Sequence, residues 1–138
     1  MVCLHVDTVI NQMENGCTRP LYCALSNEKM AIVKVKNNIE SDRVLVNELV
    51  CYLIALEIGI PVPESGTCII DEHTNILTEV DLQNNHGVGF YSTRLDKVTQ
   101  LVPGLALKIH DLENILPRLL IFDWLIYNKD RNKGNLLL

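Results

Sequence analysis

The sequence has no excess of positive charge, no long hydrophobic run and no paired-cysteine motif, and each absence disfavours a class of protein. The formal net charge of −5 argues against direct binding of nucleic acid, which usually requires a basic excess. The most apolar stretch, from Leu119 to Tyr127, is too short to cross a bilayer and contains Asp123. The amino terminus lacks the basic region and apolar core of a signal peptide. We therefore expect a cytoplasmic protein with no membrane segment.

Cysteine and histidine are present but form no recognisable metal or disulfide pattern. The cysteines are odd in number, include no CxxC pair and have spacings that suit neither a disulfide framework nor zinc; they are Cys3, Cys17, Cys23, Cys51 and Cys68. The histidines are equally scattered, at His5, His73, His86 and His110. We expect buried or incidental thiols in a reducing compartment.

The composition is that of an ordinary globular domain. The 138 residues are enough for one compact domain and too few for two. Hydrophobic residues make up 48% of the chain and charged residues 21%, which excludes a disordered protein. The sequence contains no internal repeat and no low-complexity segment. A single domain with a conventional core is expected.

Several short segments have the patterns of strands and turns. Residues 2–10 are rich in β-branched side chains and predict a strand, which is followed by a turn-forming segment around Asn15 and Gly16. Residues 21–26 and 31–36 flank "NEKM" and predict a β-hairpin. Residues 67–71 and 75–80 predict a second hairpin. Residues 81–97 show no period and predict an ordered loop or lid.

Two further segments predict helices. Residues 42–58 begin after the N-cap candidate Ser41 and end before Gly59, with two prolines beyond. One face of this helix carries Leu45, Leu49, Tyr52, Leu53 and Leu56. The second helical region covers residues 111–128, and we expect its main helix to start near Leu116 with Pro117 in the first turn. In this helix, which we expect to be buried, Leu120, Ile121, Trp124, Leu125 and Asn128 share a face. The fold class is therefore α+β, with an antiparallel sheet and one prominent helix in the first half.

Lys34 and Glu48 form the first candidate functional pair. Lys34 ends a predicted strand, and Glu48 follows fourteen residues later in the first half of the predicted helix. Kinases use a strand lysine and a helix glutamate in this way to hold the α- and β-phosphates of ATP. Other acidic residues could pair with Lys34 instead, namely Glu40, Asp42 and Glu57. A solvent-exposed lysine is the alternative interpretation.

The segment "NKDRNKGN" near the carboxyl end is the second candidate. Asp130 and Asn135 have the D-x-x-x-x-N spacing of a kinase catalytic loop. A carboxylate at this position accepts the proton of a substrate hydroxyl, and a neutral amide oxygen is a suitable ligand for Mg²⁺. Gly134 allows a sharp turn before Asn135. A simple helix-terminating turn is the alternative for this spacing alone.

The third candidate is the segment between the first two predicted strands. It contains one glycine and matches neither G-x-G-x-x-G nor the Walker A pattern. Thr18 and Arg19, together with nearby backbone N–H groups, could form an anion-binding nest. A plain loop is equally compatible with these residues.

Taken together, these residues resemble the HipA-like kinase family, in its compact bacterial branch. The likeness extends over "TRPLYCALSNEKMAIVKVKNN", "LVNELVCYLIALEIGIPVPE", "GVGFYSTRLD" and "FDWLIYNKDRNKGNLLL". The resemblance implies an ATP- and Mg²⁺-dependent Ser/Thr protein kinase with relatives that act as toxins in toxin–antitoxin modules. It also implies a kinase-like N-lobe in residues 1–80, a connecting loop in 81–110, and a helix with the catalytic loop in 111–138 as the start of a helical C-lobe.

The resemblance assigns a role to each candidate residue. Lys34 would contact ATP phosphates, Glu48 would orient Lys34, Asp130 would be the catalytic aspartate and Asn135 a magnesium ligand. Asn128 would support the loop. Thr18 and Arg19 remain candidates for phosphate binding.

The sequence also departs from the pattern of this family. No Asp or Glu follows Asn135, whereas such kinases hold Mg²⁺ with a second aspartate. We therefore expect a single incomplete kinase domain over residues 1–138, as a truncated product or one part of a split kinase. The expected binding partners are ATP and either a protein substrate or a partner chain that supplies the missing segment. The chain could also form a homo-oligomer. A catalytically inactive kinase-like module and a small-molecule or lipid kinase remain the alternatives. The role of Ser92 and Arg94, within residues 87–96, stays open.

Overall fold

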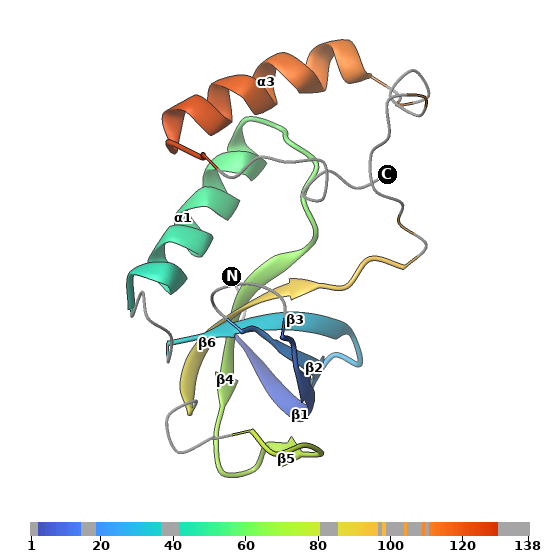
Figure 1. Cartoon of the computed structure of the whole chain (residues 1–138), viewed down its shortest axis with the longest axis vertical. Helices are drawn as coiled ribbons and strands as arrows, with labels where there is room; N and C mark the ends of the chain where they lie inside the picture. Colours follow the sequence, from blue (N-terminus) through green and yellow to red (C-terminus); the bar gives the residue numbers. More distant parts are fainter. Residues whose placement is uncertain are drawn as a thin grey trace. The chain divides into compact units, whose positions relative to one another are not determined.

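The structure is a computed structural model that describes residues 3–14, 19–36, 42–80, 86–96, 98, 104, 109 and 111–129. These residues form one sheet and the helices α1 and α3, so the fold class is α+β (Figure 1). The elements are β1 (Leu4–Gln12), β2 (Leu21–Leu25), β3 (Met30–Val35), α1 (Asp42–Glu57), β4 (Ser65–Ile70), β5 (Asn75–Ile76), β6 (Gly87–Thr93) and α3 (Leu112–Leu125). Within this described part, no helix is long and apolar enough to cross a membrane.

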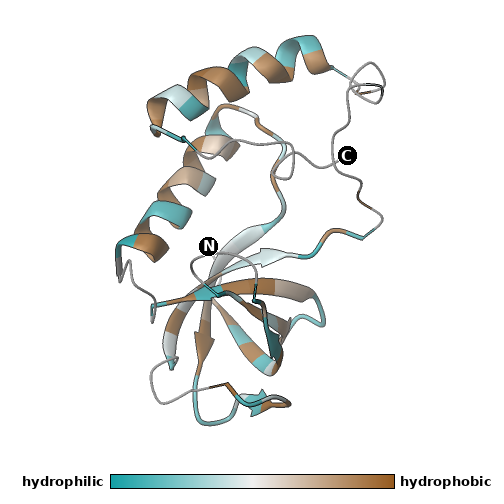
Figure 2. Cartoon of the chain, in the orientation of Figure 1, coloured by the Kyte–Doolittle hydropathy of each residue, from teal (hydrophilic) through white to brown (hydrophobic). Residues whose placement is uncertain are grey.

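The strands form a closed ring rather than an open sheet. Their order is β2-β3-β6-β4-β1-β5, and an additional pairing of β1 with β2 closes the ring. Side chains alternate between the two faces of a strand, and β2 and β3 accordingly alternate between buried and partly buried positions. Figure 2 shows apolar and polar residues mixed along these strands. The ring therefore encloses a core while its outer face remains available for other contacts.

The core consists of small and medium apolar side chains. The fully buried members with the largest volumes are Leu21, Leu25, Ile70, Val6, Val9, Val33, Cys23 and Cys68. Gly89 in β6 permits this packing, because an added Cβ would lie 3.0 Å from Val33 Cγ1 and 3.2 Å from Cys68 Sγ. A close approach of strands explains a glycine at this position without any unusual backbone angle.

Three expectations about the strands were wrong. Residues 87–93 form β6, which pairs with both β3 and β4, although the sequence predicted a loop there. The predicted hairpin of residues 67–71 and 75–80 does not form, because β5 pairs in parallel with β1. β4 also pairs in parallel with β1, so the sheet is mixed rather than antiparallel. These pairings join segments far apart in the sequence, and local turn signals do not report them.

Helix α1 was predicted correctly in position and in its carboxyl end. Gly59 has a φ of +69°, and the N–H of Ile60 donates to the carbonyl of Ala55 over 2.9 Å. The Gly59 N–H donates to the Leu56 carbonyl over 3.1 Å, which completes a Schellman motif. The predicted apolar face is rotated, because Val44 and Ala55 are the buried positions whereas Leu53 and Leu56 are 46% and 50% exposed. Ser41 lies outside the described residues.

Helix α3 differs from the prediction in its start and in its buried face. It begins at Leu112, so Pro117 lies inside the helix rather than in its first turn. Pro117 is exposed, and the carbonyl that loses its partner can therefore be hydrated. The buried residue of this helix is Phe122. The apolar residues of the face predicted from the sequence are instead exposed, by 62% at Leu120, 63% at Ile121, 82% at Trp124 and 59% at Leu125.

The chain divides into two compact units. The first contains residues 1–52 and 63–94, with all the strands and most of α1. The second contains residues 53–62 and 95–138, with the end of α1 and all of α3. In the second unit the Arg118 guanidinium lies against Gly59, at 2.9 Å from the position of an added Cβ.

Candidate functional site

The outer face of β3, β6 and β4 carries the residues of the candidate site. Lys34 is paired with Phe90, and Phe90 is paired with Thr67, so these three residues form one row across the sheet. Their neighbours along the strands, such as Val33 and Tyr91, belong to the core. Because successive side chains point to opposite faces, Lys34 and Phe90 point away from the core.

Lys34 and Glu48 are joined as the sequence suggested. The ammonium of Lys34 donates a hydrogen bond to Glu48 Oε1 and forms an ion pair with it. The side chains are 30% and 34% exposed, so the pair is half-buried. One helical turn further along α1, Tyr52 meets Phe90 edge-on, with ring centroids 6.1 Å apart and planes at 68°. One polar and one aromatic contact thus fix the first half of α1 on this face.

The ion pair of Lys34 and Glu48 contributes little to stability by itself. Pairs exposed to this degree contribute about 1 kcal/mol or less because water screens them. An ammonium group has three N–H donors. Lys34 can therefore keep its contact with Glu48 and donate to an anionic ligand at the same time.

The next row of the same face combines hydroxyl groups with apolar surface. Ile32 pairs with Ser92, and Ser92 pairs with Ser65 on the other side. The two serine hydroxyls are 2.6 Å apart. On β2, Tyr22 extends this row as the partner of Ile32.

Arg94 adds a cation to the end of this row. Its Nη1 donates to the Tyr22 hydroxyl over 2.6 Å, and the guanidinium lies 5.5 Å from the centre of the Tyr22 ring. Ser92 and Arg94 are therefore at the end of a strand rather than in a lid. Tyr22 and Ile32 were not singled out from the sequence, because only the cross-strand register brings them next to Ser92.

The other residues proposed from the sequence are only partly described. Arg19 is exposed, and its carbonyl accepts a 3.1 Å hydrogen bond from Gln12 Nε2. Asn128 donates through its side chain to Asp123 Oδ1 over 2.9 Å, next to the end of α3. Thr18, Asp130 and Asn135 lie outside the described residues, so their roles remain predictions. Within the described ranges, no cluster of His, Cys, Asp and Glu could hold a metal ion.

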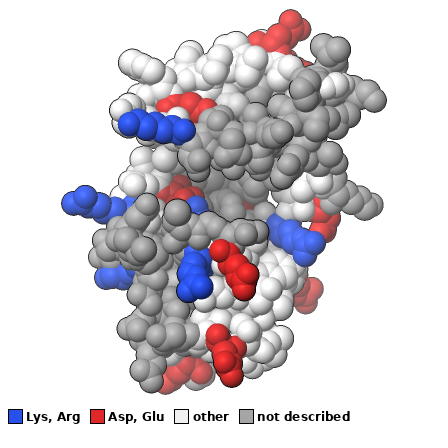
Figure 3. Space-filling view, viewed as in Figure 1, with Lys and Arg blue, Asp and Glu red and all other residues white. Residues whose placement is uncertain are grey.

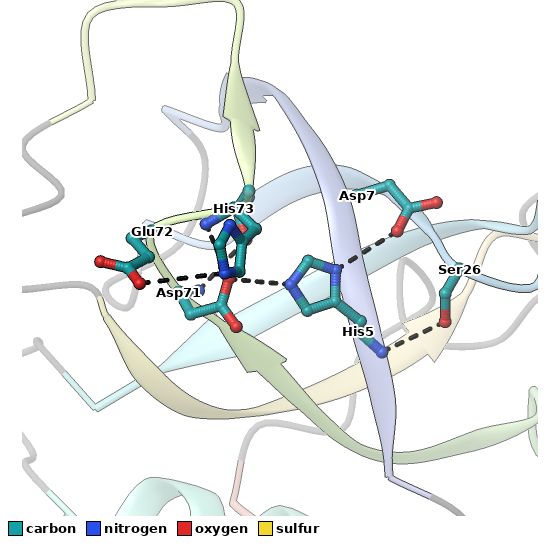
Figure 4. A network of polar contacts seen from close by, with 7 residues as sticks. His5, Asp7, Ser26, Asp71, Glu72 and His73 are labelled. Atoms are coloured by element: carbon teal, nitrogen blue, oxygen red, sulfur yellow. Dashed lines mark hydrogen bonds and ion pairs between the residues drawn. The ribbon is translucent and has the colours of Figure 1, made fainter.

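A second polar cluster lies where β1 approaches the turn after β4 (Figure 4). His5 Nε2 is 2.9 Å from Asp71 Oδ1, and His5 Nδ1 is 3.3 Å from Asp7 Oδ1. The hydrogen bond to Asp71, followed by that to Asp7, raises the pKa of His5 above 6.5. The same contact with His5 lowers the pKa of Asp71, as does the His73 N–H that donates to this carboxylate. The hydrogen bonds of this cluster join β1 to the turn after β4, and the cluster includes neither Lys34 nor Glu48.

Charged side chains of both signs lie on the described surface. Figure 3 shows Lys and Arg interspersed with Asp and Glu on the described surface of one face.

Two cysteine thiols are buried in the core. Burial raises the pKa of Cys23 and of Cys68 to about 12, so both thiols are protonated at neutral pH. The cysteines described by the structure, Cys3, Cys23, Cys51 and Cys68, are free.

Comparison with known proteins identifies the family. A family model described as HipA-like kinase matches residues 6–137, which is nearly the whole chain. No curated protein and no solved structure matches this chain. The matched range includes both Lys34 and Glu48. The chain belongs to the HipA-like kinase family.

Proposed function

We propose that this chain transfers phosphate from ATP to a Ser or Thr hydroxyl of a protein, with Mg²⁺ as the metal. Membership of the HipA-like kinase family supports kinase activity in general. The half-buried ion pair of Lys34 and Glu48 on the outer face of the sheet is the observation that carries the proposal.

The described residues suit the nucleotide part of such a site. Lys34 provides a cation held in place by Glu48, which reduces the rotamer entropy lost when phosphates bind. Next to it, Ile32 and Tyr22 offer apolar and aromatic surface for a base. The half-buried Ser92 hydroxyl adds a hydrogen-bonding group beside that surface, and the buried Ser65 hydroxyl, which donates to the Pro63 carbonyl over 2.9 Å, lies 2.6 Å from it. A ligand with an aromatic base at one end and phosphates at the other matches this order of side chains.

The catalytic step is assigned to the segment after α3. We assign Asp130 the role of accepting the proton of the acceptor hydroxyl, and Asn135 the role of a magnesium ligand. The bond of Asn128 to Asp123 supports the start of this segment. When bound, ATP would supply the phosphoryl group, and Mg²⁺ would offset the negative charge of its phosphates. Thr18 and Arg19 are proposed to contact the phosphates from the segment between β1 and β2.

This proposal assigns the sheet and α1 to a kinase N-lobe. It assigns residues 111–138 to the start of a helical C-lobe, and residues 94–110, rather than the 81–110 expected from the sequence, to the connection between the lobes. The strand β6 at residues 87–93 then forms the last N-lobe strand before the connection. ATP, a protein substrate and Mg²⁺ are the proposed binding partners.

Phosphoryl transfer from γ-labelled ATP to a Ser/Thr-rich unstructured protein tests the proposal. The Asp130→Asn variant should lose transfer by about 100-fold or more, because general-base catalysis contributes about that much. Lys34→Ala should lose transfer as well, and Lys29→Ala is its matched control, because Lys29 also pairs with a glutamate, Glu64, over 2.5 Å but is not among the proposed site residues. Transfer that survives in Asp130→Asn would contradict the assignment. Nucleotide binding without transfer would indicate a binding module, and transfer to small hydroxyl compounds alone would indicate a small-molecule kinase.

A further inference from the structure

The side of α1 that faces away from the sheet carries an apolar stripe with a charge at each end. Val46, Val50 and Leu53 are 59%, 46% and 46% exposed. Arg43 precedes them and Glu57 follows them, and both are exposed. The five positions are spaced three, four, three and four residues apart, which places them along one line of a helix. Since all five lie on one continuous helix, helix geometry alone sets their spacing.

This stripe is distinct from the face that holds α1 on the sheet. Glu48 and Tyr52 make the contacts with Lys34 and Phe90 from the opposite side of the helix. A surface helix normally has a polar outer side, and a helix that is apolar on both sides is normally covered on both. The outer stripe is therefore suited to a partner.

The two end charges are unfavourable for α1 on its own. Arg43 lies in the first turn, near the positive end of the helix dipole, and Glu57 is the last residue, near the negative end. No ion pair joins either residue to another residue in the described part of the chain. Both charges would instead be favourable beside an antiparallel helix of the same sequence, whose dipole runs in the opposite direction.

We propose that the outer stripe of α1 binds a second copy of this chain, with the two α1 helices antiparallel. Val50 lies midway between Arg43 and Glu57, so a two-fold axis at Val50 places Arg43 against Glu57 of the second copy at both ends. Each charge lies seven residues, or roughly 10 Å, from the axis. Val46 then meets Leu53 of the second copy on each side of the axis. A parallel arrangement would bring like charges together and is disfavoured.

The association is expected to be weak. Stable interfaces bury about 800 Å² on each partner, and one face of a four-turn helix provides less than that. We therefore expect a dimer that forms at about 100 µM rather than at nanomolar concentration. The inference does not depend on the proposed kinase activity.

Sedimentation equilibrium of the full chain between about 10 and 500 µM tests the proposal through charge exchange. Arg43→Glu and Glu57→Arg should each weaken dimerisation by about tenfold, because each replaces two attractions by two repulsions. The double variant Arg43→Glu/Glu57→Arg should restore the wild-type constant to within about threefold. Each exchange also agrees better with the helix dipole, so unfolding is not expected, and circular dichroism checks this.

Two further variants complete the experiment. Val50→Glu places two carboxylates on the axis and should abolish the dimer. Leu120→Glu on the exposed side of α3 should leave it unchanged. A wild-type chain that stays monomeric throughout, or a double variant that fails to recover, would overturn the proposal. If Leu120→Glu loses the dimer while the α1 variants keep it, α3 forms the dimer interface, and this result would also overturn the proposal.

Discussion

The proposed role of Glu48 as a positioning residue leads to a prediction about ATP binding. In Lys34→Ala, the charge-assisted contact with phosphate is lost, at a cost of about 1.5–3 kcal/mol. The dissociation constant for Mg²⁺-ATP should therefore rise by about 10- to 150-fold. The fold should persist, because the side chain of Lys34 is 30% exposed and its ion pair is of the weak, solvent-screened kind.

Glu48→Gln changes two opposing quantities. It weakens the contact that holds the Lys34 side chain, because a neutral amide oxygen is a poorer acceptor than a carboxylate, and fixing this side chain on binding then costs up to about 0.5–1.5 kcal/mol. It also removes a negative charge near the phosphates, which favours binding by about 0.8 kcal/mol for charges 5 Å apart in water. The two quantities nearly cancel, and we expect the loss of order to prevail by a small margin, so that affinity falls by no more than about threefold.

The double variant Lys34→Ala/Glu48→Gln separates these effects. Without Lys34 there is no side chain left to position, so Glu48→Gln should then leave affinity unchanged or improve it slightly. Isothermal titration calorimetry with Mg²⁺-ATP on the four proteins measures this coupling. Lys29→Ala should bind as the wild type does. Tighter binding by Glu48→Gln in the wild-type background would refute the positioning role, since Glu48 would then only compete with phosphate for Lys34.

Three further predictions concern the stability of the ring of strands. The pKa of His5 is raised, so the stabilisation that His5 contributes to the fold is fully present below about pH 6.5 and is lost as the pH rises through the native pKa. Between pH 6 and pH 9, the free energy of unfolding in urea should therefore fall more in the wild type than in His5→Gln. The thiols of Cys23 and Cys68, with pKa values of about 12, should not react with a disulfide reagent at pH 8 until the protein unfolds, and mass spectrometry after labelling checks this. Gly89→Ala should destabilise the fold by about 1–3 kcal/mol in urea unfolding, because the new methyl group enters a filled core. An unchanged pH slope in His5→Gln, rapid labelling of native Cys23, or a stable Gly89→Ala variant would each contradict its argument.

The elements that the sequence predicted well are those with local signals. Helix α1 combines an apolar period with Gly59 at its end and prolines beyond, and each of these acts within a few residues. Strand β6 was missed because Gly87 and Gly89 interrupt the alternation on which strand prediction depends. The parallel pairing of β5 with β1 depends on packing between distant segments, and the adjacent hairpin was the only local interpretation available.

The candidate site divides in the same way. The pairing of Lys34 with Glu48 could be predicted, because a strand followed by a helix brings these positions together. The row of Tyr22, Ile32 and Ser92 could not, because it requires the register of three strands. The exposed apolar face of α3 was expected to be buried, since periodicity shows which residues share a face but not what covers it.

Reaction of the full chain with an acyl-phosphate derivative of ATP reports whether Lys34 lies beside the phosphates of the bound nucleotide. This probe transfers its acyl group to a lysine beside the bound phosphates, and mass spectrometry identifies the modified residue. We expect modification of Lys34, suppression of this modification by excess ATP, and no comparable, ATP-sensitive modification of Lys29. Modification confined to other lysines, or modification of Lys34 that excess ATP does not suppress, would contradict the claim that the pair formed by Lys34 and Glu48 is the nucleotide site.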